Sequence, residues 1–132
     1  MTDHTQATYG IDAGRIHEVF IVGAGISGIA AAIRLQEAGH DDVVIIERAS
    51  RVGGTWRENT YPGCGCDVPS SLYSFSFFPS SRWSRLFAKQ PEILDYLEEV
   101  ADHYGVTPRI RFNTALEQAA WDESRQLWVL DT

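Results

Sequence analysis

The sequence has few cysteines and no long apolar run. Its 132 residues contain only Cys64 and Cys66, which are too close together for an ordinary unstrained disulfide and too few for a metal cluster. The histidines are scattered, without the spacing of metal ligands. No stretch approaches the ~18 consecutive apolar residues of a membrane-spanning helix, and residues 1–15 carry no apolar run typical of a secretory signal. We therefore expect no metal site and a reducing, cytoplasmic setting.

Positive charge is also scarce. Lysine and arginine number 11 against 18 acidic residues, which gives a formal net charge of −7, and Lys89 is the single lysine. A chain with this balance repels the phosphates of nucleic acids and anionic lipid surfaces. We expect neither nucleic acid nor a membrane as a partner.

The composition that remains is that of one soluble globular domain. Hydrophobic residues make up 44% of the chain and charged residues 22%. A chain of this length can bury a single core. We expect residues 1–17 to form a flexible polar tail and residues 18–132 to form the folded domain.

A strand, a helix and a second strand follow one another early in the chain. Residues 17–22 end in an apolar run and lead into Gly23, a pattern typical of a buried parallel strand. Residues 26–38 predict a helix, because consecutive alanines favour it and isoleucines recur on one face. Residues 43–46 are a continuous β-branched run. We therefore predict a βαβ unit over 18–47 and an α/β, Rossmann-like fold with a parallel sheet.

Three glycines join the first predicted strand to the helix. Gly23, Gly25 and Gly28 have the spacing G-x-G-x-x-G, which has physical meaning where a strand feeds a helix. The first permits a tight turn, the second lets the backbone approach a pyrophosphate, and the third lets helix and strand pack closely. The free amides at the helix start, Ile26 and Ser27, favour the anion. The motif in this context predicts a dinucleotide site.

An acidic residue ends the second predicted strand. Glu47 lies 19 residues after Gly28, where a carboxylate accepts hydrogen bonds from ribose hydroxyls and disfavours a 2′-phosphate. Arg48 either contacts the ribose phosphate or is a solvated surface charge. NAD and FAD domains share these features, but Gly53 and Gly54 offer a second close approach of the backbone, for which a nicotinamide domain has no obvious need.

The rest of the chain divides into an aromatic loop, a helix and strands. Residues 48–90 are rich in glycine, proline, serine and aromatics, and they predict a binding loop because a solvated linker is poor in aromatics. Residues 91–104 predict an amphipathic helix. Residues 109–131 predict a short strand at 109–112 and a small hairpin around a polar turn at 122–126.

The order of these motifs resembles the N-terminal FAD-binding region of flavin-containing and Baeyer-Villiger monooxygenases. The residues that carry the likeness are Gly23, Gly25, Gly28, Ala32, Gly39, Glu47, Gly53, Gly54, Thr55 and Trp56. Residues 59–67, with the sequence NTYPGCGCD, resemble the Baeyer-Villiger branch more closely, particularly the hydroxyacetophenone monooxygenase type. The likeness runs from about residue 19 to 132, which makes 18–132 a partial FAD/NAD(P)-binding domain.

The resemblance implies an NADPH-dependent oxidoreductase in which FAD is reduced, dioxygen adds to the flavin, and the peroxyflavin inserts an oxygen into a ketone or oxidises another small molecule. It implies that Asp67 is the acidic residue beside the reaction centre, which orients an arginine, and that Tyr73 lies near the flavin ring. The full set of cofactor contacts that the resemblance implies is Gly23, Gly25, Ile26, Ser27, Gly28, Glu47, Arg48, Gly54, Thr55, Trp56, Cys66, Asp67 and Tyr73.

Simpler interpretations of single residues stay open. Asp67 could cap a turn before Val68, since aspartate often serves turns. Cys66 could be a loop or core thiol, because nothing nearby suggests a lowered thiol pKa. Tyr73, Phe75 and Phe77 alternate at strand spacing and could only pack one face.

The chain also departs from the family that it resembles. A second glycine motif for NADPH, the Baeyer-Villiger signature and the arginine partner of Asp67 do not occur in it. We expect the N-terminal part of a monooxygenase that holds FAD weakly or not at all and is not catalytically complete alone, and that a complementing C-terminal polypeptide could complete. The alternatives are a stand-alone dinucleotide-binding module without catalysis and, with less support, a fragment of an NAD-dependent dehydrogenase.

Overall fold

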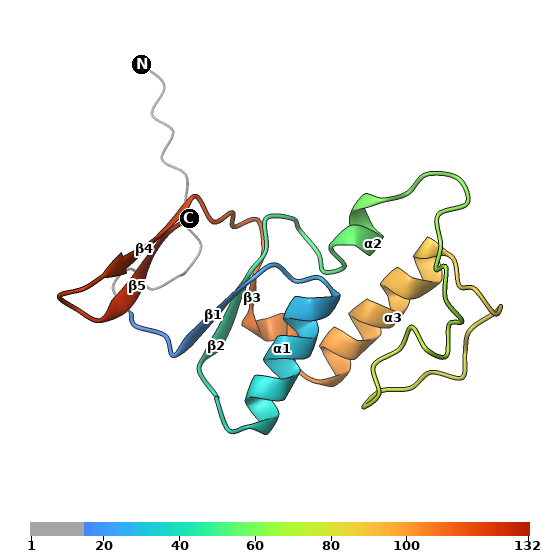
Figure 1. Cartoon of the computed structure of the whole chain (residues 1–132), viewed down its shortest axis with the longest axis horizontal. Helices are drawn as coiled ribbons and strands as arrows, with labels where there is room; N and C mark the ends of the chain where they lie inside the picture. Colours follow the sequence, from blue (N-terminus) through green and yellow to red (C-terminus); the bar gives the residue numbers. More distant parts are fainter. Residues whose placement is uncertain (1–14) are drawn as a thin grey trace, which may run out of the picture.

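The computed structural model of the chain describes residues 15–132. A three-stranded sheet with the order β1-β2-β3 lies at the centre, helices α1 and α3 lie on one side of it, and the β4-β5 hairpin stands apart on the other (Figure 1). The predicted tail falls largely outside the described residues. Residues 15–17 of the predicted tail are described, and the Nδ1 atom of His17 lies 2.8 Å from the Asp42 carboxylate.

The predicted βαβ unit is present. β1 spans Val19–Val22, α1 spans Ile26–Glu37 and β2 spans Val43–Ile46. β1 and β2 pair in parallel, with Val19 opposite Val43. β2 is buried along its whole length because it is the middle strand, which is why its sequence is an unbroken apolar run.

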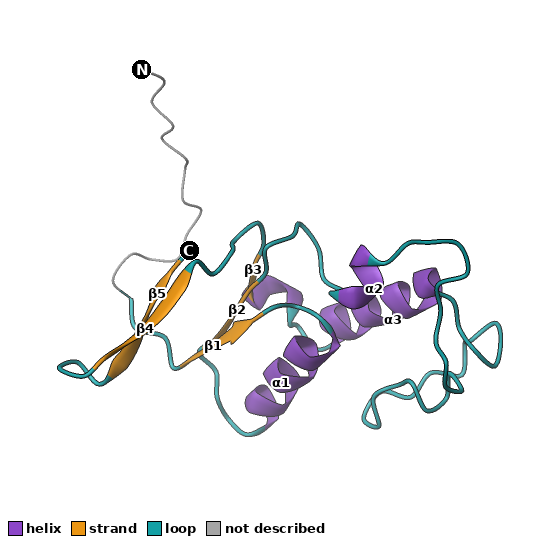
Figure 2. Ribbon diagram, turned by 45° about the horizontal axis from the view of Figure 1, so that its top comes forward, coloured by secondary structure: helices purple, strands orange, loops and turns teal. Residues whose placement is uncertain are grey.

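The third strand comes from much later in the chain. β3, Ile110–Arg111, pairs in parallel with β2 and follows a 3₁₀ turn at Thr107–Arg109. It is shorter than the predicted strand at 109–112. Because parallel strands end at the same edge of a sheet, the residues that follow β1, β2 and β3 meet there (Figure 2).

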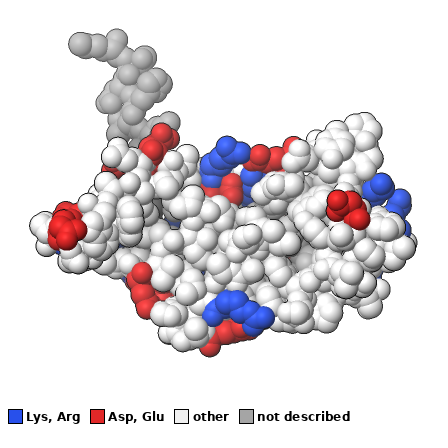
Figure 3. All heavy atoms as spheres, in the orientation of Figure 1, with Lys and Arg blue, Asp and Glu red and all other residues white. Residues whose placement is uncertain are grey.

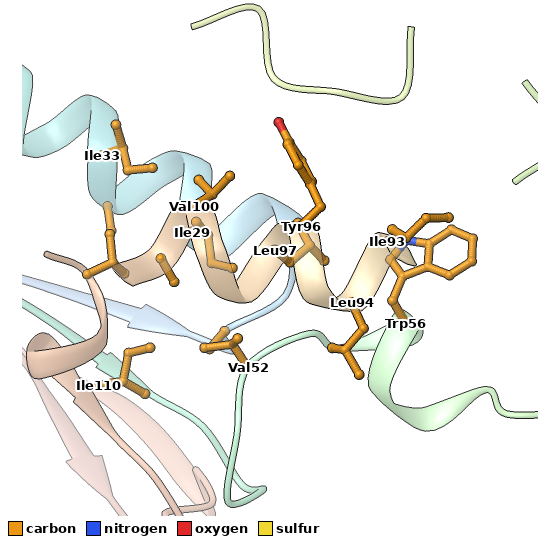
Figure 4. Packing of buried hydrophobic residues seen from close by; sticks show 14 of the residues in the cluster. Ile29, Ile33, Val52, Trp56, Ile93, Leu94, Tyr96, Leu97, Val100 and Ile110 are labelled. Atoms are coloured by element: carbon orange, nitrogen blue, oxygen red, sulfur yellow. The ribbon is translucent and has the colours of Figure 1, made fainter. Parts of the chain in front are cut away.

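Helix α3, Gln90–His103, forms the core together with α1 and the sheet. Figure 4 shows Ile29 of α1 close to Leu97 and Val100 of α3, whereas Tyr96 points away from the strands. Ile29 and Ile33 of α1 and Leu97 and Val100 of α3 are essentially inaccessible to solvent. This helix pair fixes the position of the loop between β1 and α1.

The aromatic loop contains one short helix, α2 at Thr55–Glu58, and otherwise turns. Residues 73–77 form no strand, although their alternation is compatible with one. Tyr96 of α3 and Tyr104, which directly follows α3, hold this segment instead. The Tyr96 hydroxyl accepts from the amide of Phe75 at 2.8 Å and donates to the carbonyl of Phe78 at 2.7 Å. The Tyr104 hydroxyl donates to the carbonyl of Phe77 at 3.1 Å.

The C-terminal hairpin consists of β4, Gln118–Asp122, and β5, Leu127–Asp131, paired antiparallel in a sheet of its own. This confirms the predicted hairpin. Its Trp121 and Trp128 rings meet edge to face at 5.7 Å and are largely exposed. Within residues 15–132, no helix is long and apolar enough to cross a membrane.

Candidate functional site

A cleft lies at the edge of the sheet where the parallel strands end. It consists of two adjoining hollows of about 580 Å³ and 350 Å³, which share Val22, Gly23, Gly25 and Thr55 in their walls. This is the edge at which α/β proteins of this type bind ligands, because the loops after the strands are free to diverge there. The glycine motif therefore lies between the two hollows.

The first and third glycines of the motif are required for different reasons. Gly23 has a φ of 93°, which side chains of L-residues rarely adopt. Gly28 has no room for a side chain, since a Cβ there would lie 1.9 Å from the carbonyl oxygen of Gly23. The start of α1 therefore packs directly on the backbone that leaves β1. Ile26, Ser27 and Gly28 line the smaller hollow, where the first amides of the helix lack intrahelical acceptors.

A second glycine pair packs against the motif. The Gly53 amide donates to the carbonyl of Ala24 at 2.9 Å. A Cβ on Gly54, whose φ is 51°, would lie 3.0 Å from Cα of Gly25. The two glycine loops thus touch backbone to backbone, and both Gly25 and Gly54 face the larger hollow.

Glu47 follows β2 directly and lines the larger hollow, although it is only 4% exposed. One carboxylate oxygen, Oε2, accepts from the amide of Ala24 at 2.8 Å. The other, Oε1, accepts from the amide of Ala49 at 2.9 Å. A buried carboxylate needs such donors to offset its lost hydration. It anchors the glycine loop to the end of the middle strand.

Ion pairs extend from Glu47 along the rim of the larger hollow. Arg57 Nη1 lies 3.2 Å from Glu47 Oε1, and Arg57 Nη2 donates to Glu58 Oε1 at 2.8 Å. Arg48 Nη2 donates to the same oxygen at 2.7 Å. Its hydrogen bond to Glu58 raises the pKa of Arg48, and the guanidinium groups of Arg48 and Arg57 lower the pKa of Glu58. Arg48 is exposed and ion-paired, and it also lines the hollow.

Two aromatic residues line the smaller hollow. Trp56, on α2, is buried, and its Nε1 donates to the Tyr73 hydroxyl at 3.0 Å. The Gln90 amide nitrogen also donates to the Trp56 carbonyl, which fixes α2 against the start of α3. Thr55 lines both hollows. Trp56 is therefore fixed by two hydrogen bonds, one to the Tyr73 hydroxyl and one from the Gln90 side chain.

Two residues of the predicted set lie apart from the cleft. Cys66 is buried, and its amide donates to the carbonyl of Ala88 at 2.8 Å. Asp67 is exposed in a bend. Neither lines a hollow, whereas the structure brings together the other predicted residues, namely Gly23, Gly25, Ile26, Ser27, Gly28, Glu47, Arg48, Gly54, Thr55, Trp56 and Tyr73.

Some wall residues are absent from the predicted set. Arg57 and Glu58 line the larger hollow beside Thr55, and so do residues 114–116, which follow β3. The position of 114–116 follows from the rule that ligands bind after parallel strands, once β3 is known to be parallel to β2. Arg57 carries no such signal, because its role depends on contacts across the loop.

The arrangement suits a ligand that combines an anion with a sugar. Helix amides and glycine backbone favour a pyrophosphate, and a buried carboxylate beside them favours hydroxyl donors. Figure 3 shows acidic and basic side chains mixed over one face of the molecule, without a field of a single sign. The charges that line the larger hollow, Glu47, Arg48, Arg57 and Glu58, are balanced in the same way.

Known proteins are similar to this chain in sequence and in fold. A family model described as an NAD(P)-binding Rossmann-like domain matches residues 21–90. A Baeyer-Villiger monooxygenase of Streptomyces coelicolor is 49% identical over 121 residues, which are 89% of this chain and 23% of that protein. Steroid monooxygenase bound to NADP superposes with a TM-score of 0.81 at 45% identity, covering 86% of this chain and 22% of that one.

A crystal structure of OTEMO in complex with FAD and NADP also has a TM-score of 0.81, at 38% identity over 87% of this chain and 22% of that one. The resemblance to Baeyer-Villiger monooxygenases that the sequence motifs indicate is therefore confirmed. The chain spans about a fifth of the length of these relatives.

Proposed function

The chain belongs to the NAD(P)-binding Rossmann-like domain family, and on this premise we propose that it is the FAD-binding part of an NADPH-dependent monooxygenase of the Baeyer-Villiger type. The observation that carries the proposal is the Glu47 carboxylate, buried at the end of β2 and hydrogen-bonded to the glycine loop. It places an acceptor for ribose hydroxyls next to a backbone cradle for phosphates.

The residues present fit FAD in both hollows. Gly23, Gly25 and the start of α1, including Ile26, Ser27 and Gly28, would hold the pyrophosphate. Glu47 would accept from the ribose, with Arg48 at the rim of the same hollow. Gly54, Thr55, Trp56 and Tyr73 would lie toward the flavin, because they extend from the larger hollow into the smaller one.

When bound and reduced by NADPH, FAD supplies the chemistry that inserts an oxygen atom into a ketone or another oxidisable small molecule. The part of this chain is to bind and orient the cofactor. Asp67 would orient an arginine beside the reaction centre, and Cys66 would support that segment against Ala88. The exposure of Asp67 leaves its carboxylate accessible to an arginine from a complementing polypeptide, which would also supply the NADPH site. We place this function in the cytoplasm, with no nucleic acid or membrane as partner.

Binding by the 132-residue chain tests the proposal. Isothermal titration calorimetry with ADP, which carries the ribose and pyrophosphate, should show saturable binding that Glu47→Gln weakens by ~10-fold or more, because a charge-assisted hydrogen bond is lost. FAD should bind weakly or not at all. No ADP binding by the native chain, or equal binding by Glu47→Gln, would contradict the proposed site.

One observation also supports a stand-alone dinucleotide-binding module. The glycine loops, the start of α1 and Glu47 line the two hollows together, so this chain alone offers contacts to a pyrophosphate and a ribose. NADPH oxidation separates the two functions. The monooxygenase part should show none alone and gain it when a complementing polypeptide is added, whereas a module should stay inactive in both cases. NADPH oxidation by the chain alone would contradict both.

A further inference from the structure

Arg57 is the least exposed arginine among the ion pairs of the described residues. Its side chain is 13% exposed, compared with 70% for Arg48 and 52% for Arg51. Nη1 donates to the Arg51 carbonyl at 2.7 Å and contacts Glu47 Oε1 at 3.2 Å, while Nη2 donates to Glu58. A guanidinium held by three acceptors is fixed in orientation, since its donors form a rigid fork.

The contacts of Glu47 are divided unevenly between its two oxygens. Oε1 accepts from the Ala49 amide at 2.9 Å and lies 3.2 Å from Nη1 of its ion-pair partner Arg57. Oε2 has the Ala24 amide. Each carboxylate oxygen can accept two hydrogen bonds. Among the described residues, Oε1 thus carries a hydrogen bond and the ion pair with Arg57, whereas Oε2, the oxygen hydrogen-bonded to the glycine loop, carries one hydrogen bond and keeps acceptor capacity.

We propose that Arg57 is a positioning residue for ribose recognition: by occupying Oε1 it holds the Glu47 carboxylate so that Oε2 accepts from the ligand hydroxyl. This inference rests on the proposed nucleotide site and adds a residue to it. Arg57 acts through Glu47 and makes no base-specific or phosphate-specific contribution. Its effect should therefore appear only with ligands that carry ribose hydroxyls.

The location of Arg57 supports this role over that of a simple surface ion pair. Arg82 pairs with Glu99 on the surface, and that pair lies outside both hollows. The partner of Arg57 is a buried carboxylate that faces the larger hollow. Removing one member of a buried pair leaves the other uncompensated, so the geometry of the remaining carboxylate changes.

The test compares ADP with 2′,3′-dideoxy-ADP by calorimetry on the native chain, Arg57→Gln, Arg57→Lys and the matched control Arg82→Gln. The native chain and the control should prefer ADP by ~10-fold or more, the gain expected from a hydrogen bond to a charged group. Arg57→Gln should reduce this preference to less than about 3-fold without weakening the dideoxy ligand, and Arg57→Lys, which keeps a cation, should lie between.

Each ratio comes from one sample, so a misfolded fraction does not bias it. If Arg57→Gln yields no folded protein, the result for Arg57→Lys decides. A preference of Arg57→Lys for ADP over the dideoxy ligand that equals the preference of the native chain overturns the inference. Equal weakening of both ligands would mean a purely structural role and would also overturn it. If Arg57→Gln keeps the full preference for ADP, only the proposed role of Arg57 is overturned. If the native chain does not bind ADP, the proposed function is overturned as well.

Discussion

The Trp56 indole donates its Nε1 proton to the Tyr73 hydroxyl at 3.0 Å, and the two rings meet edge to face with centroids 5.5 Å apart. This contact joins α2 to a later part of the aromatic loop, 17 residues further along the sequence. It forms one wall of the smaller hollow. Because the hydroxyl accepts from Trp56, its own proton remains available as a donor to a ligand.

Replacement of Tyr73 by phenylalanine removes this acceptor while keeping the ring. A partly buried indole N–H then lacks its partner, so the free energy of unfolding should fall by about 1 kcal/mol. Urea denaturation followed by circular dichroism measures the change. Tyr61→Phe is the control, since Tyr61 is 62% exposed and should give no comparable loss. Equal stability of Tyr73→Phe and the native chain would contradict the importance of the contact.

Two glycines of the same motif should respond differently to alanine. Gly28→Ala places a Cβ 1.9 Å from the Gly23 carbonyl oxygen, which forces α1 away from β1. This change should prevent native folding or lower the free energy of unfolding by more than about 3 kcal/mol. Gly25→Ala meets Gly54 at an ordinary 3.6 Å.

Gly25→Ala should therefore change stability by less than about 1 kcal/mol while the new methyl group weakens ADP binding by ~10-fold or more. Thermal unfolding and calorimetry on the same samples measure both effects. A folded Gly28→Ala with native stability, or unchanged ADP binding by Gly25→Ala, would show that the cleft does not use the motif in this way.

Tyr96→Phe should loosen the aromatic loop. The lost hydroxyl leaves the Phe75 amide and the Phe78 carbonyl without this partner, and unfolding should become easier by about 1–3 kcal/mol. The rate of amide hydrogen exchange should increase most at residues 75–78, while the exchange rates of the β2 amides should change only as far as global stability changes. Unaltered exchange at these residues would show that other contacts hold the loop.

Protonation of Glu58 should be linked to Arg48. The hydrogen bond from Arg48, followed by that from Arg57, lowers the pKa of Glu58 below its ordinary value of 4.5. A carboxylate with a lowered folded-state pKa stabilises the fold above the unfolded pKa, and this contribution is lost as the pH falls through the folded pKa. A carboxyl NMR titration should place the midpoint below 4.5 and move it upward in Arg48→Gln. The same midpoint in Arg48→Gln and in Arg82→Gln would contradict the linkage.

Local sequence patterns predicted the elements whose formation depends on neighbouring residues. The unbroken apolar run at 43–46 and the alanine-rich stretch around residue 31 gave β2 and α1 within one residue of their observed ends. The glycine motif and Glu47 were recognisable because their roles depend on spacing along the chain. These parts include the centre of the cleft.

The remaining parts depend on contacts between distant segments. α2 has only four residues, too few to be stable alone, and the Gln90 side chain holds it in place. The parallel pairing of Ile110 with Ile45 brings residues 114–116 to the cleft, and no local pattern specifies that pairing. Arg57 was missed for the same reason, because its carboxylate partner lies 10 residues earlier in a different element.

The backbone contact between Gly25 and Gly54 has a consequence for attempts to transfer this nucleotide loop to another scaffold. A Cβ built on Gly54 would lie only 3.0 Å from Cα of Gly25, so each glycine loop depends on the other for its shape. A graft of residues 19–47 alone would transfer one of the two loops without the other. A transfer of the paired glycine loops therefore has to extend at least through α2, and engineered chimeras should place their junction no earlier than residue 58.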